Sequence, residues 1–244
     1  MSDAPHPADS VDPVVDPVDP AWAGFLEHDG LVPDRATCEP HPSPFVGARV
    51  AAENDLPALL GYRAPLRVEL DRGAGQLAVT TRSLARQPLL EHVVALGVTV
   101  RDPGDPASAA ARVAAAAHAV RDPGAEHQLP ERVALFLDVT AAPAPTPAWL
   151  AAADEAAAAE LALTLPCEDP AGLEAWVDAA LDRELPFTLR GGTITDAVAA
   201  LRTTARLWGD AEDLAAARRW CRAWRTRRAD DDAAHLQRVQ AGDA

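Results

Sequence analysis

The sequence predicts an α/β protein in which βα repeats form a barrel-like or partly open sheet of about six strands. Short apolar segments alternate with Ala- and Leu-rich helical segments, a pattern typical of βαβ units and a largely parallel sheet. Each short segment also has one aliphatic face and one face that collects charge. A sheet covered by helices on both faces would instead have continuous hydrophobic strands. The charged face therefore indicates a polar barrel interior, a ligand, a partner or water.

The six predicted strands cover residues 45–51, 66–71, 93–101, 132–139, 159–165 and 186–190. Side chains two positions apart on a strand point the same way, so the polar residues at alternate positions should share one side of the sheet. These residues are Arg49, Arg67, Glu69, Asp71, Thr99, Arg101, Asp138, Thr140, Glu160, Thr164, Thr188 and Arg190. A closed (β/α) barrel normally has eight strands, so this pattern is two strands short of one.

Helices are expected between the strands, and Asp105-Pro106, Thr146-Pro147 and Asp169-Pro170 each place a capping residue before a proline suited to the first helical position. Residues 1–20 repeat Asp-Pro and predict a disordered acidic tail. Residues 21–31 are expected to form a short helix within a βα-repeat domain spanning 21–208. Residues 209–244 are expected to form a C-terminal helical segment, in which arginines surround Trp220 and Trp224.

Composition excludes several functions. All 22 basic residues are arginine, so a Schiff-base lysine, a lysine-anchored pyridoxal phosphate and a lysine-type phosphate loop are absent. A net charge of −15 makes a nucleic-acid or anionic-membrane binder unfavourable. Cys38, Cys167 and Cys221 are widely spaced and odd in number, which fits free thiols in a reducing compartment. With no signal segment or membrane-spanning run, we expect a cytoplasmic bacterial protein, and no particular cofactor is indicated.

The segment Arg190-Gly191-Gly192-Thr193 follows the sixth predicted strand and opens a helix. Glycines let the backbone approach a ligand, and free amides at a helix start attract anions. This loop is therefore a candidate phosphate or carboxylate site, with Arg190 as its countercharge and Arg101 as a further ligand-binding candidate. The alternative is an ordinary tight loop in which the threonine only caps the helix.

Four acids on the charged face, Glu69, Asp71, Asp138 and Glu160, could transfer protons or hold a divalent cation. Asp71 and Asp138 lie at the C-terminal ends of their strands, where barrel enzymes keep their chemistry, so these two are the candidate catalytic residues. Glu160 lies at the opposite end and is expected to be structural. The favoured alternative is that the acids pair with Arg49, Arg67, Arg101 and Arg190.

Three segments carry a resemblance to a known group of proteins. They are Leu161-Ala162-Leu163-Thr164-Leu165-Pro166, Pro186-Phe187-Thr188-Leu189-Arg190-Gly191-Gly192 and Ala217-Arg218-Arg219-Trp220-Cys221-Arg222. Their order after Phe45-Val46-Gly47 resembles that in uncharacterised actinobacterial (β/α)-repeat proteins, for which no activity is established. That group carries a lysine on each of two strands and a His-His pair, all replaced here. The resemblance implies that any activity of those groups is lost or changed in this chain.

Two functions follow from these patterns. The first is binding of a small anionic metabolite at the C-terminal ends of the strands, with a lyase or isomerase as the reaction class that fold analogy suggests. The second is a non-catalytic scaffold or subunit that meets a partner protein through its Trp/Arg helix and acidic tail. Tryptophan-rich helices more often bury their rings within their own domain.

Overall fold

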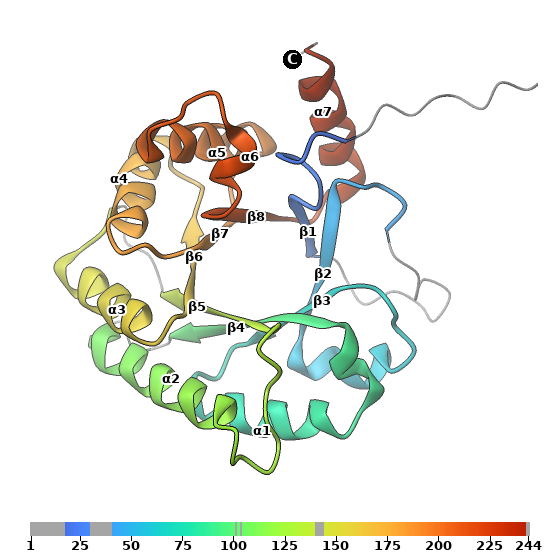
Figure 1. The fold of residues 1–244 in the computed structure, drawn as a ribbon, viewed down its shortest axis with the longest axis vertical. Helices are drawn as coiled ribbons and strands as arrows, with labels where there is room; N and C mark the ends of the chain where they lie inside the picture. Colours follow the sequence, from blue (N-terminus) through green and yellow to red (C-terminus); the bar gives the residue numbers. More distant parts are fainter. Residues whose placement is uncertain (1–17, 30–40, 101, 103, 140–143, 243–244) are drawn as a thin grey trace, which may run out of the picture.

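Eight parallel strands form a closed barrel in the order of the sequence, with the first strand paired to the last (Figure 1). The computed structural model describes residues 18–29, 41–100, 102, 104–139 and 144–242. The strands are β1 (Leu26–Asp29), β2 (Val46–Ala52), β3 (Leu66–Leu70), β4 (Val93–Val100), β5 (Ala134–Val139), β6 (Ala162–Pro166), β7 (Phe187–Arg190) and β8 (Cys221–Thr226).

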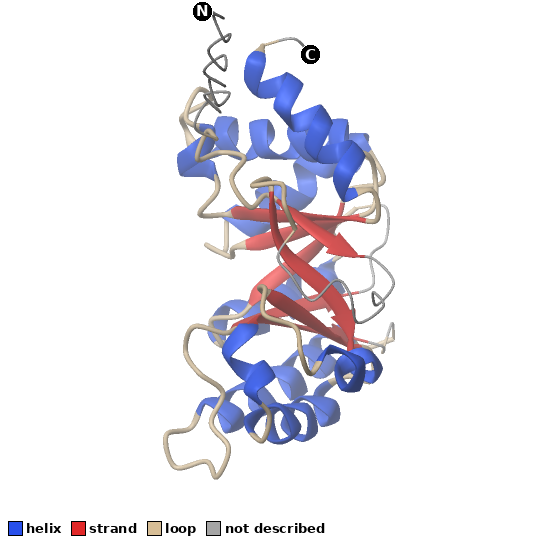
Figure 2. Cartoon of the chain, turned by 90° about the vertical axis from the view of Figure 1, so that its right-hand side faces the viewer, coloured by secondary structure: helices blue, strands red, loops and turns tan. Residues whose placement is uncertain are grey.

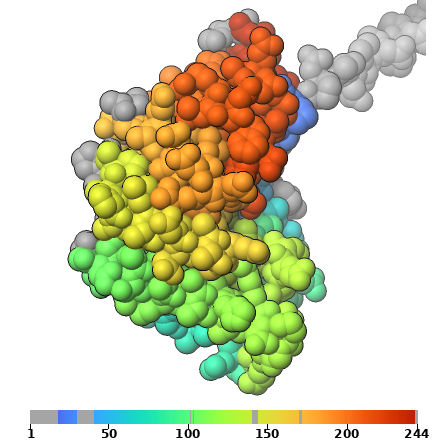
Figure 3. Space-filling model, turned by 60° about the vertical axis from the view of Figure 1, so that its left-hand side comes forward, coloured from blue at the N-terminus to red at the C-terminus, as the bar shows by residue number. Residues whose placement is uncertain are grey.

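Helices surround this barrel and lie on both sides of its strands in a side view (Figure 2). They are α1 (Ala74–Ala85), α2 (Pro106–Arg121), α3 (Pro147–Ala158), α4 (Pro170–Leu181), α5 (Ile194–Trp208), α6 (Leu214–Ala217) and α7 (Ala229–Ala241), with short 3₁₀ turns η2 (Glu53–Leu59) and η3 (Pro88–His92). Figure 3 shows that segments from green through yellow to orange-red follow one another in chain order across one face of the molecule. Right-handed βα connections between neighbouring parallel strands produce this arrangement.

The expected helix caps are confirmed for α2 and α3. The Asp105 side chain accepts a hydrogen bond from the Ser108 amide at 3.0 Å, and the Thr146 hydroxyl accepts one from the Trp149 amide at 3.2 Å. Each cap satisfies one of the amides that a helix start leaves without an internal partner. No helix in the described part of the chain combines the length and apolar character that crossing a membrane requires.

All six predicted strands are present, but the expectation of about six strands in a partly open sheet is wrong. The two further strands come from segments that were expected to be helical. β1 lies within the predicted helix 21–31, and its four residues are too few to show an alternating pattern. β8 lies within the predicted helices of 210–240, so the barrel extends beyond residue 208.

A β-bulge explains why β8 has no strand-like pattern. Phe187 of β7 pairs with Cys221, whereas the next residue, Thr188, pairs with Ala223. Arg222 is therefore an extra residue that breaks the two-residue period. Arg218, Arg222 and Arg225 are instead spaced by four and three residues, as they would be on one face of a helix.

The barrel interior has two chemically different parts. Toward the N-terminal ends of the strands, Ala95, Phe136 and Ala162 form a small apolar cluster. Toward the C-terminal ends the inward side chains are charged or hydroxylated, as the sequence predicted. Arg49 is an exception and a correction, because its neighbour Val50 pairs in register with Arg67 and occupies the inward position. Arg49 faces outward, with its guanidinium 5.9 Å from the centre of the Tyr62 ring.

Candidate functional site

Arg67 of β3 lies at the centre of the charged part of the barrel, and its side chain is completely buried. Its guanidinium donates to Glu69 Oε1 at 2.6 Å and to Glu27 Oε2 at 3.1 Å. It also donates to the hydroxyls of Thr188 at 2.8 Å and Thr164 at 2.9 Å. A buried charge is tolerated only when it is paired and its donors are satisfied, as they are here. Arg67 thus ties β1, β3, β6 and β7 together.

Two more ion pairs lie above Arg67 at the mouth of the barrel. Arg225 of β8 donates to Glu69 Oε1 at 2.6 Å, and Arg190 of β7 lies 3.1 Å from Asp138 Oδ2 of β5. Burial raises the pKa of Asp138, and Arg190 offsets part of that effect. Burial would also raise the pKa of Glu69, but Arg67 and Arg225 outweigh it and hold this pKa below its usual value.

The loop after β7 exposes backbone amides beside this mouth. Gly191 and Gly192 have φ values of 73° and 68°, a conformation that favours glycine. A Cβ atom at Gly192 would also collide with the carbonyl oxygen of Cys167. Trp224 Nε1 donates to the Gly191 carbonyl at 2.8 Å and fixes the loop from below. The amides of Gly191 and Gly192 donate to no acceptor within the described residues.

The first turn of α5 is closed by its own side chains. The Thr193 hydroxyl accepts from the Asp196 amide at 3.3 Å, and the Asp196 carboxylate accepts from the Thr193 amide at 2.8 Å. This capping box confirms the capping role of Thr193 and uses the Thr193 amide internally. The Thr193 amide is therefore not open to a ligand, whereas those of Gly191 and Gly192 are.

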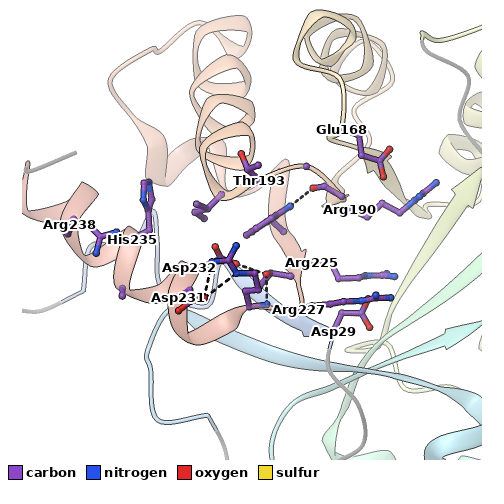
Figure 4. Close-up of a pocket in the computed structure, with 17 residues that line it drawn as sticks. Asp29, Glu168, Arg190, Thr193, Arg225, Arg227, Asp231, Asp232, His235 and Arg238 are labelled. Carbon is purple, nitrogen blue, oxygen red and sulfur yellow. Dashed lines mark hydrogen bonds and ion pairs between the residues drawn. The ribbon is translucent and has the colours of Figure 1, made fainter.

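A cavity of about 910 Å³ lies between this loop, the end of β8 and one face of α7 (Figure 4). Most of the basic side chains that line the cavity are arginines. One of them, Arg228, forms an ion pair in which its terminal guanidinium nitrogen lies 2.9 Å from Asp231 Oδ2. Arg227 and Arg238 have no ion pair among the residues that the structure describes. Other polar residues that line the cavity are Asp29, Glu168, Arg190, Arg225, Thr226, Asp232 and His235. The cavity thus offers cations and free amides at the C-terminal end of the barrel.

The predicted ligand-binding residues Arg190, Gly191, Gly192 and Thr193 all line this cavity. Arg101 lies outside the described residues. Of the two predicted catalytic acids, Asp138 lies inside the barrel mouth against Arg190, whereas Asp71 lies on the turn after β3. The Asp71 side chain is 65% exposed, with its carboxylate 3.9 Å from Arg72 Nε.

Sequence reasoning does not identify two residues of this ion-pair network, Glu27 and Arg225. The carboxylate that acts electrostatically on Asp138 is Glu69, which the sequence had grouped with the candidate acids. Glu27 and Arg225 come from the two strands that were read as helices. The local sequence carries no clear signal for them, because β1 has only four residues and the bulge interrupts the alternation of β8.

Metal binding and thiol chemistry find little support in the described residues. No group of three or more His, Cys, Asp or Glu side chains in the described part of the chain is placed to hold a metal ion. Burial raises the pKa of the Cys167 thiol to about 12, so this cysteine is a poor nucleophile. Trp220 and Trp224 are buried, and residues 221–226 form a strand, so the expectation of a Trp/Arg helix here is wrong.

The fold and this site define a closed (β/α)₈ barrel whose candidate site lies at the C-terminal face, where enzymes of this fold place their active sites. A candidate phosphonomutase from Burkholderia cenocepacia J2315 has the same fold, with a TM-score of 0.55 and 17% identity over 91% of this chain and 95% of that one. Deoxyribose phosphate aldolase from Aeropyrum pernix matches with a TM-score of 0.40 and 15% identity over 91% and 93%. No protein-family model and no curated protein sequence matches the chain.

Proposed function

We propose that this protein binds a small metabolite through a phosphate or carboxylate group at the C-terminal face of its barrel. The observation that carries the proposal is the pair of unoccupied amides at Gly191 and Gly192, which open into an arginine-lined cavity. Consecutive amides in a left-handed turn form a concave anion site, and neighbouring guanidinium groups add charge-assisted hydrogen bonds. Arg227 lines the same cavity and has no carboxylate partner in the described part of the chain, so its guanidinium is available to a ligand.

The paired arginines support the same proposal. Arg190 and Arg225 are register neighbours on β7 and β8, and each has one carboxylate partner. Arg225 Nε is buried and makes no hydrogen bond. A guanidinium has five N–H donors, so one carboxylate leaves part of each group for a ligand. The carboxylates would hold both arginines in place while the site is empty.

Asp138 is the residue that we propose for proton transfer. Its raised pKa brings its titration closer to neutral pH, and its partner Arg190 lies at the edge of the cavity. Asp71 is a second proposed acid from the same face of the barrel. This arrangement fits a lyase or isomerase that acts on the bound anion. The name of the structurally similar phosphonomutase is consistent with such a reaction.

A thermal-shift panel tests the proposal with inorganic phosphate, sugar phosphates, small carboxylates and divalent metal salts. We expect phosphate or a phosphorylated compound to raise the melting temperature, and Arg227→Gln to weaken binding by about tenfold through loss of one charge-assisted contact. Arg82→Gln, on the exposed surface of α1, is the matched control and should leave the shift unchanged. A shift equal in both variants, or none with any probe, would overturn the anion site.

A further inference from the structure

A second cavity, of about 480 Å³, lies at the opposite end of the barrel. It is bounded by the starts of β5, β6, β7 and β8 and by the C-terminal ends of α2, α3 and α4. Four arginines and three glutamates line it, above a floor of small apolar residues. None of these residues belongs to the site proposed above, so this cavity needs a separate explanation.

Two of the four arginines that line this cavity differ from the others in having no close polar contact among the described residues. Arg183 lies 2.6 Å from Asp154, and Arg132 donates to the Leu90 carbonyl at 2.9 Å. Arg121 and Arg222 make no ion pair or side-chain hydrogen bond within the described ranges. Burial lowers the pKa of both groups, and only Arg121 has a nearby carboxylate, Glu160, to offset the effect. Arg222 is the extra residue of the β8 bulge. It has no partner on β7 in the strand pairing, and its side chain lines this cavity.

Two of the three glutamates in this cavity have an unusual backbone conformation. Glu160 and Glu184 have φ values of 52° and 53°, and no other non-glycine residue in the described part of the chain has a positive φ. Each follows a helix in a Schellman turn: the Leu161 amide bonds the Ala156 carbonyl at 2.9 Å, and the Leu185 amide bonds the Ala180 carbonyl at 3.0 Å. Helices usually place glycine at this position.

The end of α5 shows the alternative within the same chain. There Gly209, with φ = 105°, occupies the equivalent position and lines no part of this cavity. An L-residue in the left-handed region is strained, and such strain concentrates at functional positions. Two glutamates in strained positions on one cavity therefore indicate that their carboxylates are used.

We propose that this cavity binds a small zwitterion, a molecule carrying both a carboxylate and an ammonium group, of which a free amino acid is the simplest. Arg222 and Arg121 receive the carboxylate, and Glu160 and Glu184 receive the ammonium group. The C-terminal ends of α3 and α4 carry partial negative charge and favour the same cation. A simple anion would face the three glutamates, and a simple cation would face the two unpaired arginines.

Isothermal titration calorimetry on the intact protein tests this zwitterion site with the standard amino acids. Acetate and succinate, which carry only carboxylates, and methylamine and putrescine, which carry only ammonium groups, serve as half-ligands. At least one amino acid should bind, and each half-ligand should bind at least about tenfold more weakly, because it satisfies only one set of charges. Arg222→Gln should weaken amino-acid binding by about tenfold or more, whereas Arg202→Gln, exposed on α5, should not.

Glu184→Gly distinguishes a ligand role from a structural one. Removing strain at a positive φ should raise the melting temperature of the unliganded protein by about 2 °C or more. The same change should weaken amino-acid binding. A Glu184→Gly variant with a higher melting temperature and weaker amino-acid binding would support the site. Absence of binding by every amino acid, or binding unchanged in both Arg222→Gln and Glu184→Gly, would overturn it without bearing on the phosphate panel at the other face.

Discussion

The two halves of the barrel interior are filled by different kinds of side chain. Near the strand starts, Ala95, Phe136 and Ala162 fill the space with apolar atoms, whereas near the strand ends Arg67 and its partners fill it with charge. The two halves meet where the Arg67 guanidinium lies 4.3 Å from the centre of the Phe136 ring. The apolar half needs only volume, but the charged half needs every partner present. Loss of one group should therefore be far more damaging in the charged half.

The largest expected effect is that of Arg67→Met. This change leaves Glu27 and Glu69 buried without their main counterion, and should lower the free energy of unfolding by about 3–5 kcal/mol. Urea denaturation followed by circular dichroism measures it. The double variant Arg67→Met, Glu27→Gln should recover part of the loss, because Glu69 keeps Arg225 as its counterion and no buried carboxylate is left without one. A single variant as stable as the parent protein would refute the central role of Arg67.

Glu69→Gln should have a smaller effect that depends on pH. Near neutral pH we expect a loss of about 2 kcal/mol, because two charge-assisted contacts are weakened. The folded-state pKa of Glu69 lies below its ordinary value of 4.5, so its ionised form stabilises the fold above that pH and the contribution disappears as pH falls further. The difference between parent and variant should therefore shrink below about pH 4.5 in urea titrations. A difference that is constant with pH would contradict the ion pairs.

Phe136→Leu should have the smallest effect of the three. The apolar half of the interior loses some volume and the ring beneath Arg67, which should cost about 1 kcal/mol. The same denaturation experiment measures it, with the m-value as a check that the fold is retained. If this variant proved less stable than Arg67→Met, the contrast between the two halves would be reversed.

The sequence predicted the fold where side-chain alternation was strong. In 66–71 and 186–190 polar and aliphatic residues alternate strictly, and both strands are present with Arg67, Glu69, Thr188 and Arg190 inward, although Asp71 lies on the turn after β3. In β2, Ala48, Val50 and Ala51 are small or aliphatic on both faces, so alternation could not tell which way Arg49 points. β8 was missed because its bulge shifts the pattern by one residue, and a local pattern contains no information about pairing with a distant strand.

At the candidate site, local features could be predicted from the sequence and contacts between distant residues could not. The Arg190-Gly191-Gly192 turn could be found because it needs only local residues whose conformational and charge properties are visible in one segment. Glu69 and Arg225 could not be joined in this way, because they lie 156 residues apart and meet only when the barrel closes. Spatial pairs of this kind depend on topology, which composition and periodicity do not specify.

The pairing of β1 with β8 has a consequence for biosynthesis. Residues 221–226 are synthesised after all the other strands of the barrel, so the sheet cannot close before then. Until that point, β1 through β7 can form only an incomplete sheet, with β1 and β7 as unpaired edges and with Glu69 still lacking Arg225. Such edges promote pairing with other chains. We therefore expect the nascent protein to depend on chaperones most strongly during synthesis of its last strand.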